Sequence, residues 1–297
     1  MPPPSEATQA PDVYKPATPS PVVPTPAIAA APPPLADVGD GGQLFRDCEE
    51  CPVMVVIPSG SGLIGSPVGE SGHELSEEPR QRVNLARPIA VGRDSITYAE
   101  WHNCLAEGGC GNFPPPDMGW GGGAQPVVLV SWNDAKSYVA WLSKKTHETY
   151  RLLSESEWEY GARACRTSVC RDWAFWFGNA INPDLANYDW RYSYAGGRKA
   201  QALGKPRPIN SYGPNRFGLF NMAGNVQQWV EDCWNPNLID LPSDGAARVS
   251  GDCSSRVVRG GSWDDEPVNV RSAARKYDVA KARLSYIGFR VARELSR

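Results

Sequence analysis

Three kinds of functional signal are missing from this 297-residue sequence. Only three histidines occur, His73, His102 and His147, and they lie in separate segments, which argues against an iron site built from two histidines and a carboxylate. The net charge of -3 and the absence of a basic run argue against a nucleic-acid partner. There is no P-loop, no dinucleotide-binding glycine motif that leads into a helix and no G-x-S-x-G elbow. Nucleotide-dependent and serine-hydrolase chemistry therefore find no support.

Long apolar runs are missing as well. The most apolar part of the first 40 residues, PAIAAAPPPLA, is too short and too rich in proline to span a membrane or to form the core of a signal peptide. Residues 1–43 are dominated by Pro and Ala, which predicts a disordered linker because such a composition buries too little apolar surface to offset chain entropy. A linker in this position suggests a tether, and an upstream signal or anchor lost through a mis-assigned start codon is one explanation.

The remaining residues, 44–297, are predicted to form a single domain. Hydrophobic residues make up 41% of the chain, and 11 Trp with 29 Gly indicate large indoles packed among tight turns. Thr97, Ser131 and Ser154 are each followed three residues later by a carboxylate, which predicts three helix starts with capping boxes. Strands are expected in VMVVIPSG, PVVLVSW, RVVRGGSW and IGFRVARE. Because strands and helices neither alternate nor segregate, the predicted class is α+β with much irregular structure.

The eight cysteines fall into four local pairs beside loop-like sequence. The pairs are Cys48 with Cys51, Cys104 with Cys110, Cys165 with Cys170, and Cys233 with Cys253. An even number in neighbouring pairs favours disulfides, and disulfides favour an oxidising compartment, so a periplasmic or secreted location is predicted. Reduced structural thiols are one alternative. A zinc site is another, because Cys48-x2-Cys51 has the spacing of half a site, although no second pair completes it.

A series of ordered blocks carries a family resemblance. The blocks are MVVIPSGSGLIGS, PVVLVSWNDAKSYVAWLS, YRLLSESEWEYGARA, LANYDW, PINSYGPNRFGLFNMAGNVQQWVEDCW, RVVRGGSW, RSAAR and GFRVARE. In this order they resemble the formylglycine-generating enzyme, or sulfatase-modifying factor, family. The resemblance spans roughly residues 50–295. It implies one irregular, loop-rich domain with a C-type-lectin-like fold.

The resemblance also implies structural calcium. At a first site Asn215 would supply its side chain, with backbone carbonyls from Arg216, Gly218 and Phe220. A second site would be formed by Asn187 and Tyr188. Amide and carbonyl oxygens suit a hard cation such as calcium. The alternative at the first site is that Pro214-Asn215 only starts a turn.

The segment RGGSWDDEPVNVRSAAR, residues 259–275, departs from the family where its chemistry takes place. Family members that oxidise a sulfatase cysteine bind copper through two cysteines shortly after GGS, whereas residues 263–275 contain none. Thiolates suit Cu(I) and carboxylates do not, so copper is not expected. The family block GNVWEW also reads GNVQQW here. The residues expected to line the altered pocket are Ser262, Trp263, Asp264, Asp265 and Trp229.

Three functions remain open. The first is a noncatalytic binding or accessory domain, a pseudoenzyme, whose partner is a protein, a peptide or a small polar ligand. The second is a divergent oxidase or maturation enzyme that uses another metal or acts on another substrate, such as a nonribosomal peptide side chain. The third is formylglycine generation on sulfatases without the cysteine pair. The first is preferred because the framework is kept while the reactive pair is lost. Neither enzymatic status nor oligomeric state follows from the sequence.

Overall fold

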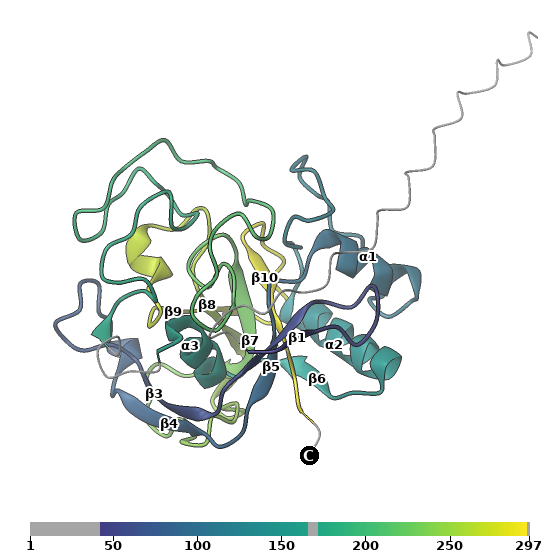
Figure 1. Cartoon of the computed structure of the whole chain (residues 1–297), viewed down its shortest axis with the longest axis horizontal. Helices are drawn as coiled ribbons and strands as arrows, with labels where there is room; N and C mark the ends of the chain where they lie inside the picture. Colours follow the sequence, from purple (N-terminus) through teal and green to yellow (C-terminus); the bar gives the residue numbers. More distant parts are fainter. Residues whose placement is uncertain (1–41, 166–171, 296–297) are drawn as a thin grey trace, which may run out of the picture. The chain divides into compact units, whose positions relative to one another are not determined.

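The computed structural model describes residues 42–165 and 172–295 (Figure 1). The predicted linker therefore lies almost entirely outside the described residues. The helices are α1 (Tyr98–Ala106), α2 (Trp132–Thr146) and α3 (Glu155–Arg163), with 3-10 turns η1 (Leu75–Glu77) and η3 (Pro267–Val270). The strands are β1 (Leu44–Phe45), β2 (Met54–Ile57), β3 (Gly60–Ile64), β4 (Gln81–Leu85), β5 (Ile89–Gly92), β6 (Tyr150–Leu152), β7 (Gln227–Trp234), β8 (Asp252–Arg259), β9 (Arg275–Val279), β10 (Ile287–Phe289) and β11 (Val291–Arg293).

Three sheets organise the described residues. A five-stranded sheet has the order β1-β2-β5-β11-β6, a four-stranded sheet has the order β10-β7-β8-β9, and β3 pairs with β4. All pairings are antiparallel except that of β10 with β7. One residue, Arg290, separates β10 from β11, so the chain passes directly from one large sheet to the other. Arg290 is fully buried and donates to the carbonyls of Gly92, Arg93 and Phe220. These hydrogen bonds fix the point at which the chain passes from one sheet to the other.

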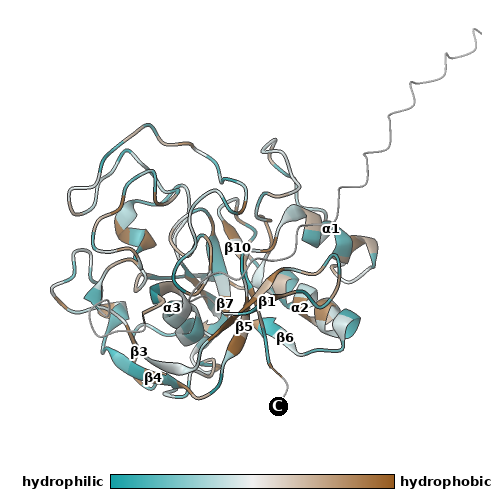
Figure 2. Ribbon diagram, in the orientation of Figure 1, coloured by the Kyte–Doolittle hydropathy of each residue, from teal (hydrophilic) through white to brown (hydrophobic). Residues whose placement is uncertain are grey.

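All three predicted helix starts are confirmed. Thr97, Ser131 and Ser154 each cap a helix through a capping box with the carboxylate three residues later. Helices α1 and α2 pack together through aromatic side chains, and Trp101 stacks on Tyr138 with ring centroids 6.0 Å apart. These rings belong to the largest apolar cluster of the described residues. In Figure 2 the apolar colour gathers on central strands such as β5.

Two strand predictions need correction. PVVLVSW forms no strand, although Val127, Val128 and Val130 are buried, because Leu129 has a φ of 58°, which turns the backbone out of the extended region. IGFRVARE forms two short strands rather than one, since the chain changes sheets at Arg290. The strands expected in VMVVIPSG and RVVRGGSW are confirmed as β2 and β8.

Three of the four predicted disulfides are present. They join Cys48 to Cys51, Cys104 to Cys110, and Cys233 to Cys253. Cys165 is also disulfide-bonded, and its predicted partner Cys170 lies outside the described residues. These cross-links are consistent with an extracellular or periplasmic protein. No helix in the described part of the chain is long and apolar enough to cross a membrane.

Helix α3 is hydrophilic and yet completely buried. Figure 2 shows little apolar colour along it, and all nine of its residues are buried. Its carboxylates pair with buried arginines from distant segments: Glu159 pairs with Arg259 of β8, and Glu155 with Arg275 of β9 at 2.6 Å. A buried charge is tolerated only when it is paired and hydrogen-bonded, so these ion pairs fix α3 against the four-stranded sheet.

Removing one member of this cluster should be costly. We expect Arg259→Met to lower the free energy of unfolding by about 3–5 kcal/mol, because it removes one of the two arginines that compensate the buried Glu159 and leaves the carbonyls of Ala273 and Ala274 without their donor. The control is Arg283→Met, which removes an arginine that is 40% exposed and pairs with Asp134, and should cost less than about 1 kcal/mol. Urea unfolding compares them, and equal losses would contradict the role given to the buried pair.

Asp232 of β7 should make stability depend on pH. Burial, followed by the nearby charge of Glu155, raises the pKa of Asp232 to about 8. The unfolded chain loses this proton near its ordinary pKa of about 4 whereas the folded chain keeps it, so stability falls as pH rises between about 4 and 8. We expect Asp232→Asn to flatten this decline. A wild-type minus variant difference in unfolding free energy that stays constant from about pH 5 to 8 would refute the assignment.

Candidate functional site

The segment that joins β8 to β9 is held in place by buried arginines. Arg259, at its start, donates to the carbonyls of Ala273 and Ala274, near its end. Arg271 pairs with Glu77 at 2.7 Å and with Glu70 at 2.6 Å. These contacts fix both ends of the segment. The residues that follow GGS, between the two ends, line a cavity.

A tight turn begins this segment. Gly261 has a φ of 65°, and a Cβ atom there would lie 2.3 Å from Cγ1 of Val270. Only glycine combines this backbone conformation with this close approach. The turn places Ser262, Asp264 and Asp265 in the lining of a cavity.

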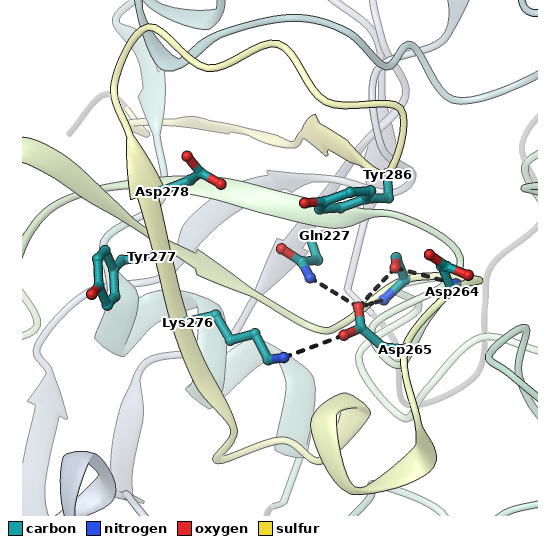
Figure 3. A pocket seen from close by; sticks show the side chains of 8 residues that line it. Gln227, Asp264, Asp265, Lys276, Tyr277, Asp278 and Tyr286 are labelled. Atoms are coloured by element: carbon teal, nitrogen blue, oxygen red, sulfur yellow. Dashed lines mark hydrogen bonds and ion pairs between the residues drawn. The ribbon is translucent and has the colours of Figure 1, made fainter. Parts of the chain in front are cut away.

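This cavity, which we call the carboxylate pocket, has a volume of about 250 Å³. Its wall comes from β7, β9, the segment after GGS and the residue before β10 (Figure 3). The lining residues are Gln227, Ser262, Asp264, Asp265, Lys276, Tyr277, Asp278 and Tyr286.

Asp265 is the centre of a hydrogen-bond network in the carboxylate pocket. Its Oδ2 atom accepts hydrogen bonds from the backbone N–H of Ser262 at 2.9 Å and from the hydroxyl of Ser262 at 2.7 Å. The same oxygen accepts from the side-chain amide of Gln227 at 2.8 Å. Its Oδ1 atom lies 3.4 Å from Nζ of Lys276. The dashed lines in Figure 3 show this network, which holds the Asp265 side chain in place as a hydrogen-bond acceptor.

The carboxylate pocket carries an excess of negative charge. Asp264, Asp265 and Asp278 line it against the single cation Lys276. Burial raises the pKa of Tyr286, and the charges of these aspartates raise it further. A positively charged or hydrogen-bond-donating group is therefore the complementary guest.

The structure brings together some of the predicted pocket residues and separates others. Ser262, Asp264 and Asp265 lie together in the lining of the carboxylate pocket. Trp263 instead lines a neighbouring cavity of about 310 Å³ and packs edge-on against Trp120. Trp229 is not in the pocket: its ring is buried in the core, where its Nε1 donates to the carbonyl of Val130.

Sequence reasoning missed five members of the carboxylate pocket, which are Gln227, Lys276, Tyr277, Asp278 and Tyr286. Lys276 and Asp278 are two positions apart in β9 and therefore lie on the same face of the strand. This spacing is the signal that the sequence offers, but nothing in the sequence says which face of β9 meets the pocket. Tyr286 and Gln227 join the site because the backbone N–H of Gln227 donates to the carbonyl of Tyr286.

The residues proposed for metal binding differ in how they fit a cation. Among the described residues, no three His, Cys, Asp or Glu side chains gather closely enough to hold a metal ion. At the first calcium site, Oδ1 of Asn215 already accepts from the backbone N–H groups of Phe217 and Leu219, and the carbonyl of Phe220 accepts from the guanidinium of Arg290. Two of the four predicted ligand oxygens therefore already accept hydrogen bonds from the protein.

Asn187 offers a better fit. Its side chain is fully buried, and its Nδ2 donates to the carbonyl of Lys205 and to Oδ1 of Asn225. Its own Oδ1 is buried with no hydrogen-bond partner. A buried acceptor without a donor is costly, so this oxygen is available to a cation or a water molecule.

The chain is similar to proteins of a known family. The model of the sulfatase-modifying factor enzyme 1-like domain matches residues 42–295. The chain belongs to this family. The predicted fold, an irregular loop-rich α+β domain of the sulfatase-modifying factor type, is thereby confirmed.

Curated relatives of this family include both active and inactive members by name. The formylglycine-generating enzyme of Streptomyces coelicolor is 33% identical over 178 residues, 57% of this chain and 52% of that protein. The mouse protein named inactive C-alpha-formylglycine-generating enzyme 2 is 31% identical over 179 residues, 58% of this chain and 50% of that protein. The chain thus spans about half the length of these relatives.

A solved structure extends the similarity across the domain. PvdO from Pseudomonas aeruginosa is 37% identical, with a TM-score of 0.74, and the alignment covers 86% of this chain and 99% of that one. Treponema denticola variable protein 1 matches with a TM-score of 0.63 at 20% identity, which shows the shared fold alone.

The Asp265 network provides a test of the site geometry. We expect Asp265→Asn to lower the free energy of unfolding by about 1–3 kcal/mol, because the amide cannot replace the charge-assisted bonds to Ser262 and Lys276. The matched control is Asp264→Asn in the same loop, which alters an exposed side chain and should change stability by less than about 0.5 kcal/mol. Urea unfolding of both variants measures the difference, and a smaller loss for Asp265→Asn than for the control would contradict the network.

Proposed function

We propose that this chain is a ligand-binding member of the sulfatase-modifying factor family, whose carboxylate pocket takes a small cationic group on a peptide or polar molecule. The observation that carries the proposal is the charge of the cavity. Three aspartates face one lysine in a space of about 250 Å³, and two of them, Asp264 and Asp265, lie in the segment where the family resemblance implies the copper-binding cysteines. The pocket has room for an aminoalkyl group and offers carboxylate oxygens to its ammonium.

Binding of n-butylammonium, measured by NMR chemical-shift titration, tests this proposal. We expect saturable shifts of the Asp264 and Asp278 amides, and binding at least about tenfold weaker for the neutral isostere n-pentane and for butyrate. Asp278→Asn should weaken n-butylammonium binding about threefold to tenfold, because it removes one of the three carboxylates. Absence of saturable shifts, or a preference for butyrate, would overturn the proposal.

A second candidate is a maturation enzyme that acts on the bound group. It is favoured by the convergence of Asp265, Lys276 and Tyr286, three proton-exchanging side chains from three different segments, in one cavity. A Cys-x-Pro-x-Arg peptide incubated with the protein, copper, reductant and oxygen tests the formylglycine reaction by mass spectrometry. Conversion of cysteine would establish that reaction, and an unchanged mass would remove it.

Structural calcium forms part of the proposal, at Asn187 rather than at Asn215. The unpartnered buried Oδ1 of Asn187 supports this choice. We expect calcium added to chelator-treated protein to raise the melting temperature by several degrees, and magnesium to raise it less, because calcium accepts irregular sets of oxygen ligands. Asn187→Ser should reduce the response to calcium while Asn215→Ser preserves it. No change in melting temperature with calcium would remove the metal from this account.

A further inference from the structure

Strand β9 forms one wall of the carboxylate pocket and is also an edge of its sheet. In the order β10-β7-β8-β9 it pairs only with β8, over the register Ser255 to Val279 through Arg259 to Arg275. In the described part of the chain no other strand pairs with β9. An edge strand presents backbone N–H and C=O groups that an added strand can use.

The hydrogen-bond pattern between β8 and β9 shows which backbone groups of β9 point away from β8. The backbone N–H of Ala280 donates to the carbonyl of Ser254 at 2.8 Å. Hydrogen-bonded positions alternate along an antiparallel pair, so Lys276 and Asp278 bond to β8 while the N–H and C=O of Tyr277 point away from it.

The backbone groups of Val279, which also point away from β8, are already hydrogen-bonded. The N–H of Val279 donates to Oδ1 of Asp278, and the carbonyl of Val279 accepts from the N–H of Ala282. Among the described residues, no hydrogen bond from a partner beyond β8 reaches the backbone of Tyr277. Tyr277 is therefore the position at which the edge of β9 can receive another chain.

Side-chain alternation connects this position to the carboxylate pocket. In Figure 3 the side chains of Lys276 and Asp278 extend to the pocket side of β9, whereas the Tyr277 ring lies on the other side. That ring stacks on Trp234 with centroids 4.3 Å apart, which holds the strand at this point. A chain paired with Tyr277 would have its adjacent side chains on the pocket side, next to Lys276 and Asp278.

We infer that the ligand is an extended peptide that adds as a short strand to β9 at Tyr277 and inserts a cationic side chain into the carboxylate pocket. The inference rests on the proposed function, since the pocket supplies the charge selectivity. The two backbone hydrogen bonds at Tyr277 supply the additional affinity and fix which residue enters. Peptide recognition by strand addition uses this division between main-chain affinity and side-chain specificity.

Three probes separate the peptide inference from the proposed function. They are the peptide acetyl-Val-Thr-Lys-Thr-Val-amide, the same peptide with both threonine nitrogens methylated, and n-butylammonium, each titrated by NMR against the full chain. We expect the unmethylated peptide to bind about tenfold more tightly than the other two, and the amide of Tyr277 to shift only with that peptide. Methylation removes the N–H that the carbonyl of Tyr277 would accept.

Each outcome decides one of the two claims. If n-butylammonium binds and the two peptides bind no more tightly than it does, the strand-addition inference fails while the pocket function stands. If n-butylammonium and both peptides fail to bind, the proposed function fails as well. In a second test, Tyr277→Pro, which lacks the outward N–H, should weaken the unmethylated peptide more than Tyr277→Ala does. Equal effects of the two substitutions would also overturn the inference.

Discussion

The buried pairing of arginines with carboxylates is the constraint on which the site depends. Arg259, Arg271 and Arg275 lie near the two ends of one segment and pair with carboxylates of α3 and of the 3-10 turn η1. A lone charge in these positions would be expensive, so each partner requires the other. The pairs hold the ends of the segment rigidly while the residues after GGS line the cavity between them. They also explain why the hydrophilic helix α3 is buried.

The framework that holds the segment after GGS does not depend on the residues that would carry redox chemistry. The glycine turn, the arginine pairs and the sheet order require no cysteine after GGS. The segment after GGS carries carboxylates instead, with Asp265 held by Ser262, Gln227 and Lys276. Fixed carboxylates in a confined space favour binding of a cationic group over coordination of a soft metal.

Much of the local structure follows from the sequence, whereas most of the pocket does not. Capping boxes at Thr97, Ser131 and Ser154 and the local cysteine pairs depend on residues close together in the chain, and they were predictable for that reason. Trp229, the last residue of the GNVQQW block, was assigned to the pocket, but its ring is buried in the core, where its Nε1 donates to the carbonyl of Val130. The pairing of Arg275 with Glu155 joins residues 120 positions apart, which no local pattern indicates.

Anaerobic loading with Cu(I), followed by desalting and elemental analysis, tests the central claim most directly. The account predicts no stoichiometric copper, because Asp264, Asp265 and Asp278 are hard ligands and all cysteines of the described residues are in disulfides. The chain should retain calcium alone under the same conditions. One copper per chain that survives desalting would contradict the account and favour a copper-dependent oxidase instead.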